Sequence, residues 1–208
     1  MIDSIYQLDK KMSEYSEMSS YDNPEEAIAL LYSEGLELAS LDIEALINGN
    51  IHIDDVLIVM FHAGMGEDYT FEGYLDPANY DIRSAYIEES MLGLVSSDSW
   101  MKENNIVKGI LLPEGLNLIY YDTIDDIYGC QEDMLCDVQI GMTGLFSYLL
   151  GYEFGLNEMF NRANGKTGIG KFGLMDIGSF NIRGTLPSPP NPWSRLMMEW
   201  DEVEILNY

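Results

Sequence analysis

Residues 140–160 read IGMTGLFSYLLGYEFGLNEMF, an apolar segment followed by a glycine, an acidic residue and an aromatic residue. Positions 140–154 are apolar nearly all round, and this predicts a helix in the interior of the protein. Tyr148 and Tyr152 are four residues apart, so their rings share one face of that helix. Glu158 follows shortly after its expected end.

The segments before this helix alternate between helical and extended patterns. A helix is expected over residues 23–41, where Asn23 can cap the first turn and Pro24 suits it. Residues 56–61 are continuously apolar, which predicts a fully buried strand, stopped by Gly64. The mixed order of helices and strands indicates an α+β or α/β domain. We expect α+β with a mixed sheet.

Several other segments carry turn signals. Residues 65–86 are expected to form a long loop, and residues 106–122 a hairpin that turns at the proline, glutamate and glycine in its middle. Residues 164–180 predict a glycine-rich turn region. Residues 186–200 begin with several prolines and are expected to continue as a short helix, followed by a final strand at residues 203–206.

The composition excludes several classes of protein. The chain has 208 residues, which suggests a single domain over residues 1–208. Thirty-six acidic residues against ten basic ones give a formal net charge of −26, which repels nucleic acids and anionic membranes. No apolar run approaches the ~18 residues that span a bilayer. The first twenty residues lack an apolar core, so no signal peptide is visible.

Common catalytic motifs are absent from the sequence. Residues 168–170 read Gly-Ile-Gly but do not continue as GxGxxG, and there is no P-loop. The histidines are His52 and His62, so a serine nucleophile has few possible bases. No histidine occurs in residues 63–208, and a two-histidine zinc motif on a helix is therefore excluded in any register.

One acidic segment has the oxygen-rich composition that calcium prefers. Residues 41–55 alternate oxygen-bearing side chains, although the spacing is not that of an EF-hand loop. A polar turn before the strand is the simpler interpretation, and both stay open. The candidate calcium ligands are Asp42, Asn48, Asn50, Asp54 and Asp55.

The two cysteines are close together in the sequence. Cys130 and Cys136 enclose five residues, a spacing that suits a small disulfide loop in an oxidising compartment. Two unrelated thiols are the alternative. A metal site is not expected there, because no other cysteine or histidine lies nearby.

Four stretches, taken in order, resemble the immune inhibitor A family of secreted zinc metallopeptidases. They are HAGMGED at 62–68, YLLGYEFGLNEMF at 148–160, TGIGKFGLMDIGSFN at 167–181 and LPSPPNPWSRLMMEW at 186–200. Their order and spacing agree with the family over roughly residues 20 to 205. The resemblance implies a zincin-like fold and an extracellular or cell-surface location. The family's upstream strands have no counterpart here, so the chain is expected to be a fragment that lacks them.

The resemblance also implies that the zinc chemistry is lost. The family's two zinc histidines fall on Tyr148 and Tyr152, its catalytic glutamate on Leu149, and its third ligand position on Glu158. A tyrosine must lose a proton of pKa about 10 to bind a metal. Leu149 cannot act as a general base. Met175 matches the family's methionine turn and would serve in packing.

These replacements predict a catalytically inactive domain that acts as a binding or structural module. Zinc is not expected and calcium is the one cofactor considered. The partner would be a peptide segment, a glycan or a neighbouring domain. The residues expected to line the binding cleft are His62, Gly64, Tyr148, Tyr152, Glu158 and Met175. The alternative is an active peptidase with non-standard ligands, in which Tyr152 and Glu158 are joined by Glu67 or Asp68.

Overall fold

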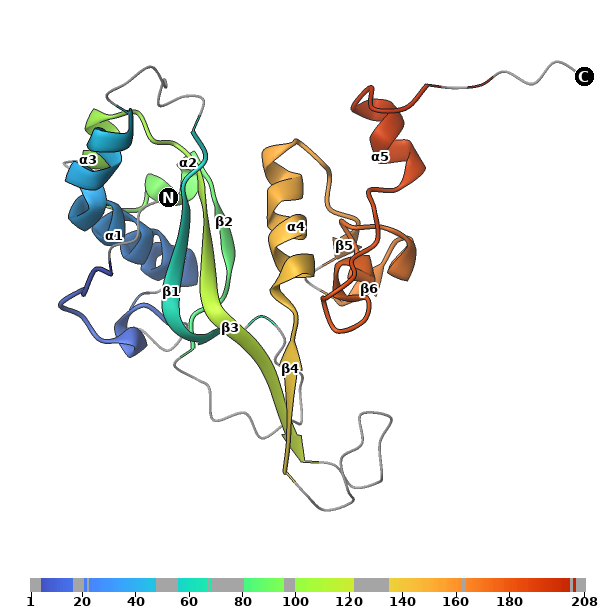
Figure 1. The fold of residues 1–208 in the computed structure, drawn as a ribbon, viewed down its shortest axis with the longest axis horizontal. Coiled ribbons are helices and arrows are strands. Elements are labelled where there is room, and N and C mark those ends of the chain that lie inside the picture. Colours follow the sequence, from blue (N-terminus) through green and yellow to red (C-terminus); the bar gives the residue numbers. More distant parts are fainter. Residues whose placement is uncertain are drawn as a thin grey trace, which may run out of the picture. The chain divides into compact units, whose positions relative to one another are not determined.

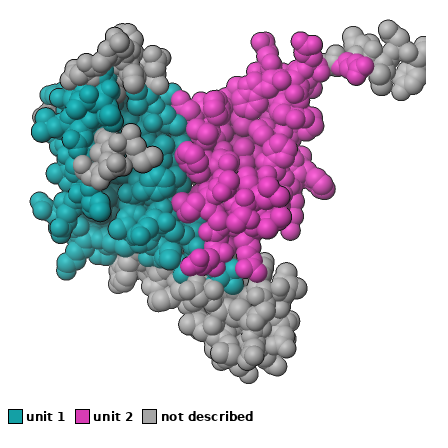
Figure 2. Space-filling view, viewed as in Figure 1, with its two compact units in different colours: residues 1–138 teal, residues 139–208 magenta. Residues whose placement is uncertain are grey.

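The structure, a computed structural model, is of the mixed α+β class that the sequence predicts. It describes residues 5–16, 21, 23–47, 56–66, 68, 81–95, 100–121, 135–161, 164–202 and 204. The chain divides into two compact units, residues 1–138 and residues 139–208 (Figure 2). No helix in the described part of the chain is long and apolar enough to cross a membrane.

The main helix of unit 1 confirms the helix expected at residues 23–41 and is longer. Helix α1 spans Pro24–Ile47, and the Asn23 side chain accepts a hydrogen bond of 2.9 Å from the Glu25 N–H. The buried face repeats every three or four residues as far as Ile43, which explains the extra turns. The residues of that face are Ile28, Tyr32, Leu36, Ala39 and Ile43. Asp42 therefore lies on a helix and not in a polar turn.

A four-stranded mixed sheet packs against this helix (Figure 1). The central strand β3 (Gly109–Tyr121) pairs in parallel with β1 (Val59–Gly66) and antiparallel with β2 (Ala85–Ile87). Strand β4 (Leu135–Ile140) also pairs with β3. Short helices α2 (Glu89–Leu92) and α3 (Trp100–Glu103) contact α1, and a 3₁₀ turn (Met12–Glu14) precedes it.

The hairpin expected at residues 106–122 is wrong, because β3 runs straight through Pro113. A proline has no N–H to give to a neighbouring strand. Strand β1 accommodates it with a bulge: His62 lies opposite Pro113 and Met65 opposite Gly115, so β1 carries one extra residue. The bulge contains Gly64, whose φ of 94° is strained for any other residue.

The expectation of a fully buried strand at residues 56–61 is also wrong. The residues before β1 and within it are mostly half-buried, and Phe61 is 65% exposed. The strand does not stop at Gly64 but continues to Gly66, because the bulge absorbs the irregularity. The expected loop at residues 65–86 is shortened at both ends by β1 and β2, and its residues 69–80 lie outside the described part.

Unit 2 is built on helix α4 (Met142–Glu153), followed by short elements. The expected turn region is confirmed: it holds strand β6 (Lys166–Thr167), which pairs with β5 (Phe160–Asn161), and two 3₁₀ turns at Gly170–Phe172 and Ile177–Phe180. The expected short helix is α5 (Pro192–Met197), whose Ser194 N–H is capped by Asn191 at 3.0 Å. Most of the expected final strand, residues 203–206, lies outside the described residues.

Helix α4 is less buried than its sequence suggests. Its buried residues are Gly144, Leu145, Leu149 and Gly151, which lie toward one side, whereas Phe146 is 37% exposed. The expectation of a helix enclosed on all sides is therefore wrong. Small residues on the buried side bring the backbone of α4 close to its neighbours.

Candidate functional site

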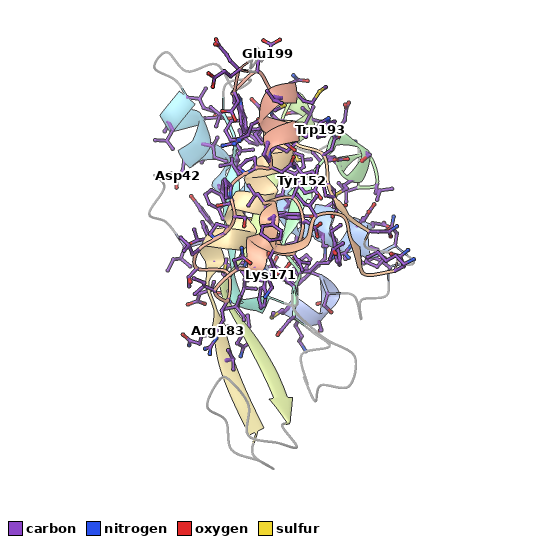
Figure 3. The ribbon with its side chains drawn as sticks, turned by 90° about the vertical axis from the view of Figure 1, so that its right-hand side faces the viewer. Asp42, Tyr152, Lys171, Arg183, Trp193 and Glu199 are labelled. Carbon is purple, nitrogen blue, oxygen red and sulfur yellow. The ribbon has the colours of Figure 1, made fainter. Side chains whose placement is uncertain are left out.

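Tyr148 and Tyr152 lie one helical turn apart on α4 and their hydroxyl oxygens are 2.8 Å apart (Figure 3 labels Tyr152). Their rings meet edge to face, with centroids 5.3 Å apart and planes at 88°. The Tyr148 hydroxyl also donates a short hydrogen bond to Glu158 Oε1. The Tyr148 hydroxyl thus contacts both the Tyr152 hydroxyl and the Glu158 carboxylate, and all three side chains are half-buried.

The two tyrosines rest on a small apolar cluster within unit 2. Leu156, Leu174 and Met175 form its buried centre, and Met198 packs against this centre as the two tyrosines do. Met175 is 1% exposed, and a Cβ on Gly151 would lie 2.4 Å from its sulfur atom. This contact agrees with the packing role that the sequence suggested for Met175. Because Gly151 has no side chain, α4 can lie directly against the segment that carries Met175.

Asp176 is a buried residue of this region that the sequence analysis did not single out. Its carboxylate accepts hydrogen bonds of 2.7–2.9 Å from the backbone N–H groups of residues 168, 169, 170 and 177. Burial raises the pKa of the Asp176 carboxyl, but these four donors outweigh burial, so that its pKa lies below the ordinary value. Two features of the sequence could have indicated this role. An acidic residue directly follows Met175, and a Gly-Ile-Gly segment with three backbone N–H groups lies a few residues before it.

His62 and Gly64, the other two residues expected in the cleft, belong to β1 of unit 1. His62 Nδ1 lies 3.0 Å from the carbonyl oxygen of Ala63. Burial lowers the pKa of His62, against the opposing effect of the carbonyls of Ala63 and Ile82, so the ring is neutral at pH 7. The structure brings together Tyr148, Tyr152, Glu158 and Met175 within unit 2. A cleft that combines the two units stays a prediction.

Asp68 follows β1 and joins the end of that strand to the start of β2. Its carboxylate accepts hydrogen bonds of 2.9 Å from both the N–H and the hydroxyl of Ser84. Burial raises the pKa of Asp68 to about 6, although Ser84 and the charge of Arg83 act in the opposite direction. Glu67, the other acidic ligand of the alternative peptidase site, lies outside the described residues.

We expect Asp68→Asn to be more stable than the wild type at neutral pH and equally stable in mild acid. The folded chain binds the Asp68 proton more tightly than the unfolded chain, so stability falls as the pH rises from about 4 to about 6. The variant should match the wild type at pH 4 and exceed its free energy of unfolding by about 2 kcal/mol at pH 7. Urea unfolding at four pH values measures this difference. Glu89→Gln, on an exposed residue of α2, is the control and should show no such trend.

The calcium candidates are placed only in part. Asp42 lies on α1 and accepts a hydrogen bond from the Tyr6 hydroxyl. Asn48, Asn50, Asp54 and Asp55 lie outside the described residues, so the calcium site stays a prediction. Within the described ranges no three His, Cys, Asp or Glu side chains are grouped to hold a metal ion. Cys130 is also outside them, and the disulfide stays untested.

Comparisons with protein-family models, with curated proteins and with solved structures each gave no match. The zincin-like fold and membership of the immune inhibitor A family therefore stay predictions from the sequence motifs.

Proposed function

We propose that this chain is a catalytically inactive relative of the immune inhibitor A metallopeptidases, with a zincin-like fold and an extracellular role. It acts as a binding or structural module for a peptide segment, a glycan or a neighbouring domain. The observation that carries this proposal is the cluster of Tyr148, Tyr152 and Glu158. The polar groups at the three ligand positions bind one another.

The position of the general base supports the same proposal. Leu149 is 4% exposed and belongs to the buried side of α4. A leucine side chain cannot take a proton from a water molecule. Met175 belongs to the apolar cluster on which both tyrosines pack, and it lies against Gly151 of α4. A scaffold that keeps this arrangement without the chemistry favours binding over hydrolysis.

The experiment is to restore the two histidines. In the double variant Tyr148→His and Tyr152→His, two imidazoles four residues apart face Glu158, which gives zinc three ligands and an open position. We expect this variant to retain near-stoichiometric zinc after dialysis, measured by mass spectrometry, and the wild type to retain none. Leu149 is left unchanged, so that no charge is buried.

Glu158→Gln in the two-histidine background is the matched control. Because an amide is a poor zinc ligand, it should weaken zinc binding by more than about tenfold. A two-histidine variant that folds but binds zinc no better than the wild type contradicts the zincin-like geometry. Stoichiometric zinc in the wild type, together with chelator-sensitive cleavage of a peptide library, contradicts the loss of catalysis and favours the alternative peptidase.

A further inference from the structure

The tyrosine–glutamate cluster can offer three anionic oxygen atoms to one metal ion. The two phenol oxygens are 2.8 Å apart, and Glu158 Oε1 is in hydrogen-bond contact with that of Tyr148. Neighbouring ligands of an octahedral ion with metal–oxygen bonds of about 2.0 Å are separated by about 2.8 Å. The separation of the two phenol oxygens, which is that of an ordinary hydrogen bond, therefore also equals that of two adjacent ligands.

The charge and softness of these ligands select the kind of ion. Two phenolates and one carboxylate carry three negative charges, which balance a trivalent cation. All three atoms are hard oxygen donors, so metals that prefer sulfur ligands bind them weakly. Zinc and calcium provide too little charge to displace two phenol protons of pKa about 10 near neutral pH. Ferric iron is the biologically common ion that can displace phenol protons near neutral pH, and a tyrosine ligand of iron occurs in some haem proteins.

We propose that Tyr148, Tyr152 and Glu158 form a binding site for a ferric ion. The two phenol protons leave to solvent and the three oxygens occupy one face of the octahedron. The other three positions take water or a small chelating anion. The side chains are half-buried, so that an ion can reach them while the rings stay packed on the cluster around Met175. This site goes beyond the proposed function, because it depends on three oxygen atoms and not on descent from a peptidase.

The test is to mix the purified protein with ferric nitrilotriacetate and record the visible spectrum. Iron bound by a phenolate gives a charge-transfer band in the visible region, which neither the protein nor the chelate shows alone. We expect this band, with one iron per chain retained through gel filtration. A spectrum without the band, or iron that leaves the protein on the column, overturns the proposal.

Matched variants assign the band to the site. Tyr148→Phe and Tyr152→Phe keep the ring packing and remove one oxygen each, so each should weaken iron binding by more than about tenfold. Tyr86→Phe, on β2 of unit 1, should leave both the band and the stoichiometry unchanged. Circular dichroism confirms that each variant is folded. A band that survives the double substitution at 148 and 152 shows adventitious iron and also overturns the proposal.

Discussion

Replacing Asp176 with alanine is expected to lower the free energy of unfolding of unit 2 by about 3 kcal/mol or more. The carboxylate accepts four backbone hydrogen bonds while it is only 2% exposed. A net hydrogen bond to a charged group contributes about 1.5–3 kcal/mol. Because residues 168 and 169 are exposed, water can satisfy part of what is lost. The turn at residues 168–170 and the segment carrying Met175 would separate.

Tryptophan fluorescence during urea unfolding measures this loss. Trp193 and Trp200 lie in unit 2, and a Trp100→Phe background leaves them as the reporters, since the chain has three tryptophans. Ser179→Ala is the control, because it removes one hydrogen bond to the backbone of Asp176 and should cost only about 1 kcal/mol. Equal losses in the two variants would show that the carboxylate does not hold this turn together.

The direction in which acid changes this difference in stability can also be predicted. Because the pKa of folded Asp176 lies below its ordinary value, the carboxylate stabilises unit 2 above about pH 4. That contribution is lost as the pH falls further, through the pKa of the folded state. The difference between the wild type and Asp176→Ala should therefore shrink as the protein is acidified. A difference that stays constant with pH would assign the loss to packing alone.

The parts of the fold that follow from local pattern were predictable. The capping residue Asn23 and the spacing of Ile28, Tyr32 and Leu36 specify α1, and Asn191 with the following proline specifies the start of α5. Within the candidate site, the spacing of Tyr148 and Tyr152 was enough to place both rings on one face. Short-range rules suffice in each case, because the interacting residues are at most four positions apart.

The parts that depend on distant partners were not predictable. Pro113 looks like a turn residue, and only the bulge around Gly64, some fifty positions earlier, lets a strand continue past it. The direction of the tyrosine hydroxyls depends on Glu158, which follows the helix, and the role of Asp176 depends on the conformation of residues 168–170. One sequence cannot show which of its many acidic residues has such a partner.

Gly144→Ala should also destabilise unit 2, by about 2 kcal/mol or more. A Cβ at this position would lie 1.8 Å from the backbone oxygen of Ser179 and 3.1 Å from that of Gly184. The Gly144 N–H also donates a 2.7 Å hydrogen bond to the Gly184 carbonyl, so the first turn of α4 is held against backbone on both sides. No flexible side chain can move aside, and the strain of overpacking falls on the main chain.

Two effects of opposite sign compete in Gly144→Ala, and their magnitudes decide the outcome. Alanine favours a helix over glycine by about 1 kcal/mol. Overpacking against rigid backbone costs about 3 kcal/mol or more, so the net effect destabilises unit 2. A unit of this size has a total stability of about 5 kcal/mol, so a large fraction of it is lost.

Amide hydrogen exchange of peptides from α4 measures this loss directly. Thr143→Ala, on the exposed neighbour in the same turn, gains helix propensity without a clash and should slow exchange slightly. Gly144→Ala should accelerate it strongly and should also weaken iron binding, because Tyr148 and Tyr152 are carried by the displaced helix. Slower exchange in both variants would mean that α4 does not rest on the backbone of Ser179. The position of the tyrosine oxygens relative to Glu158 would then need another support.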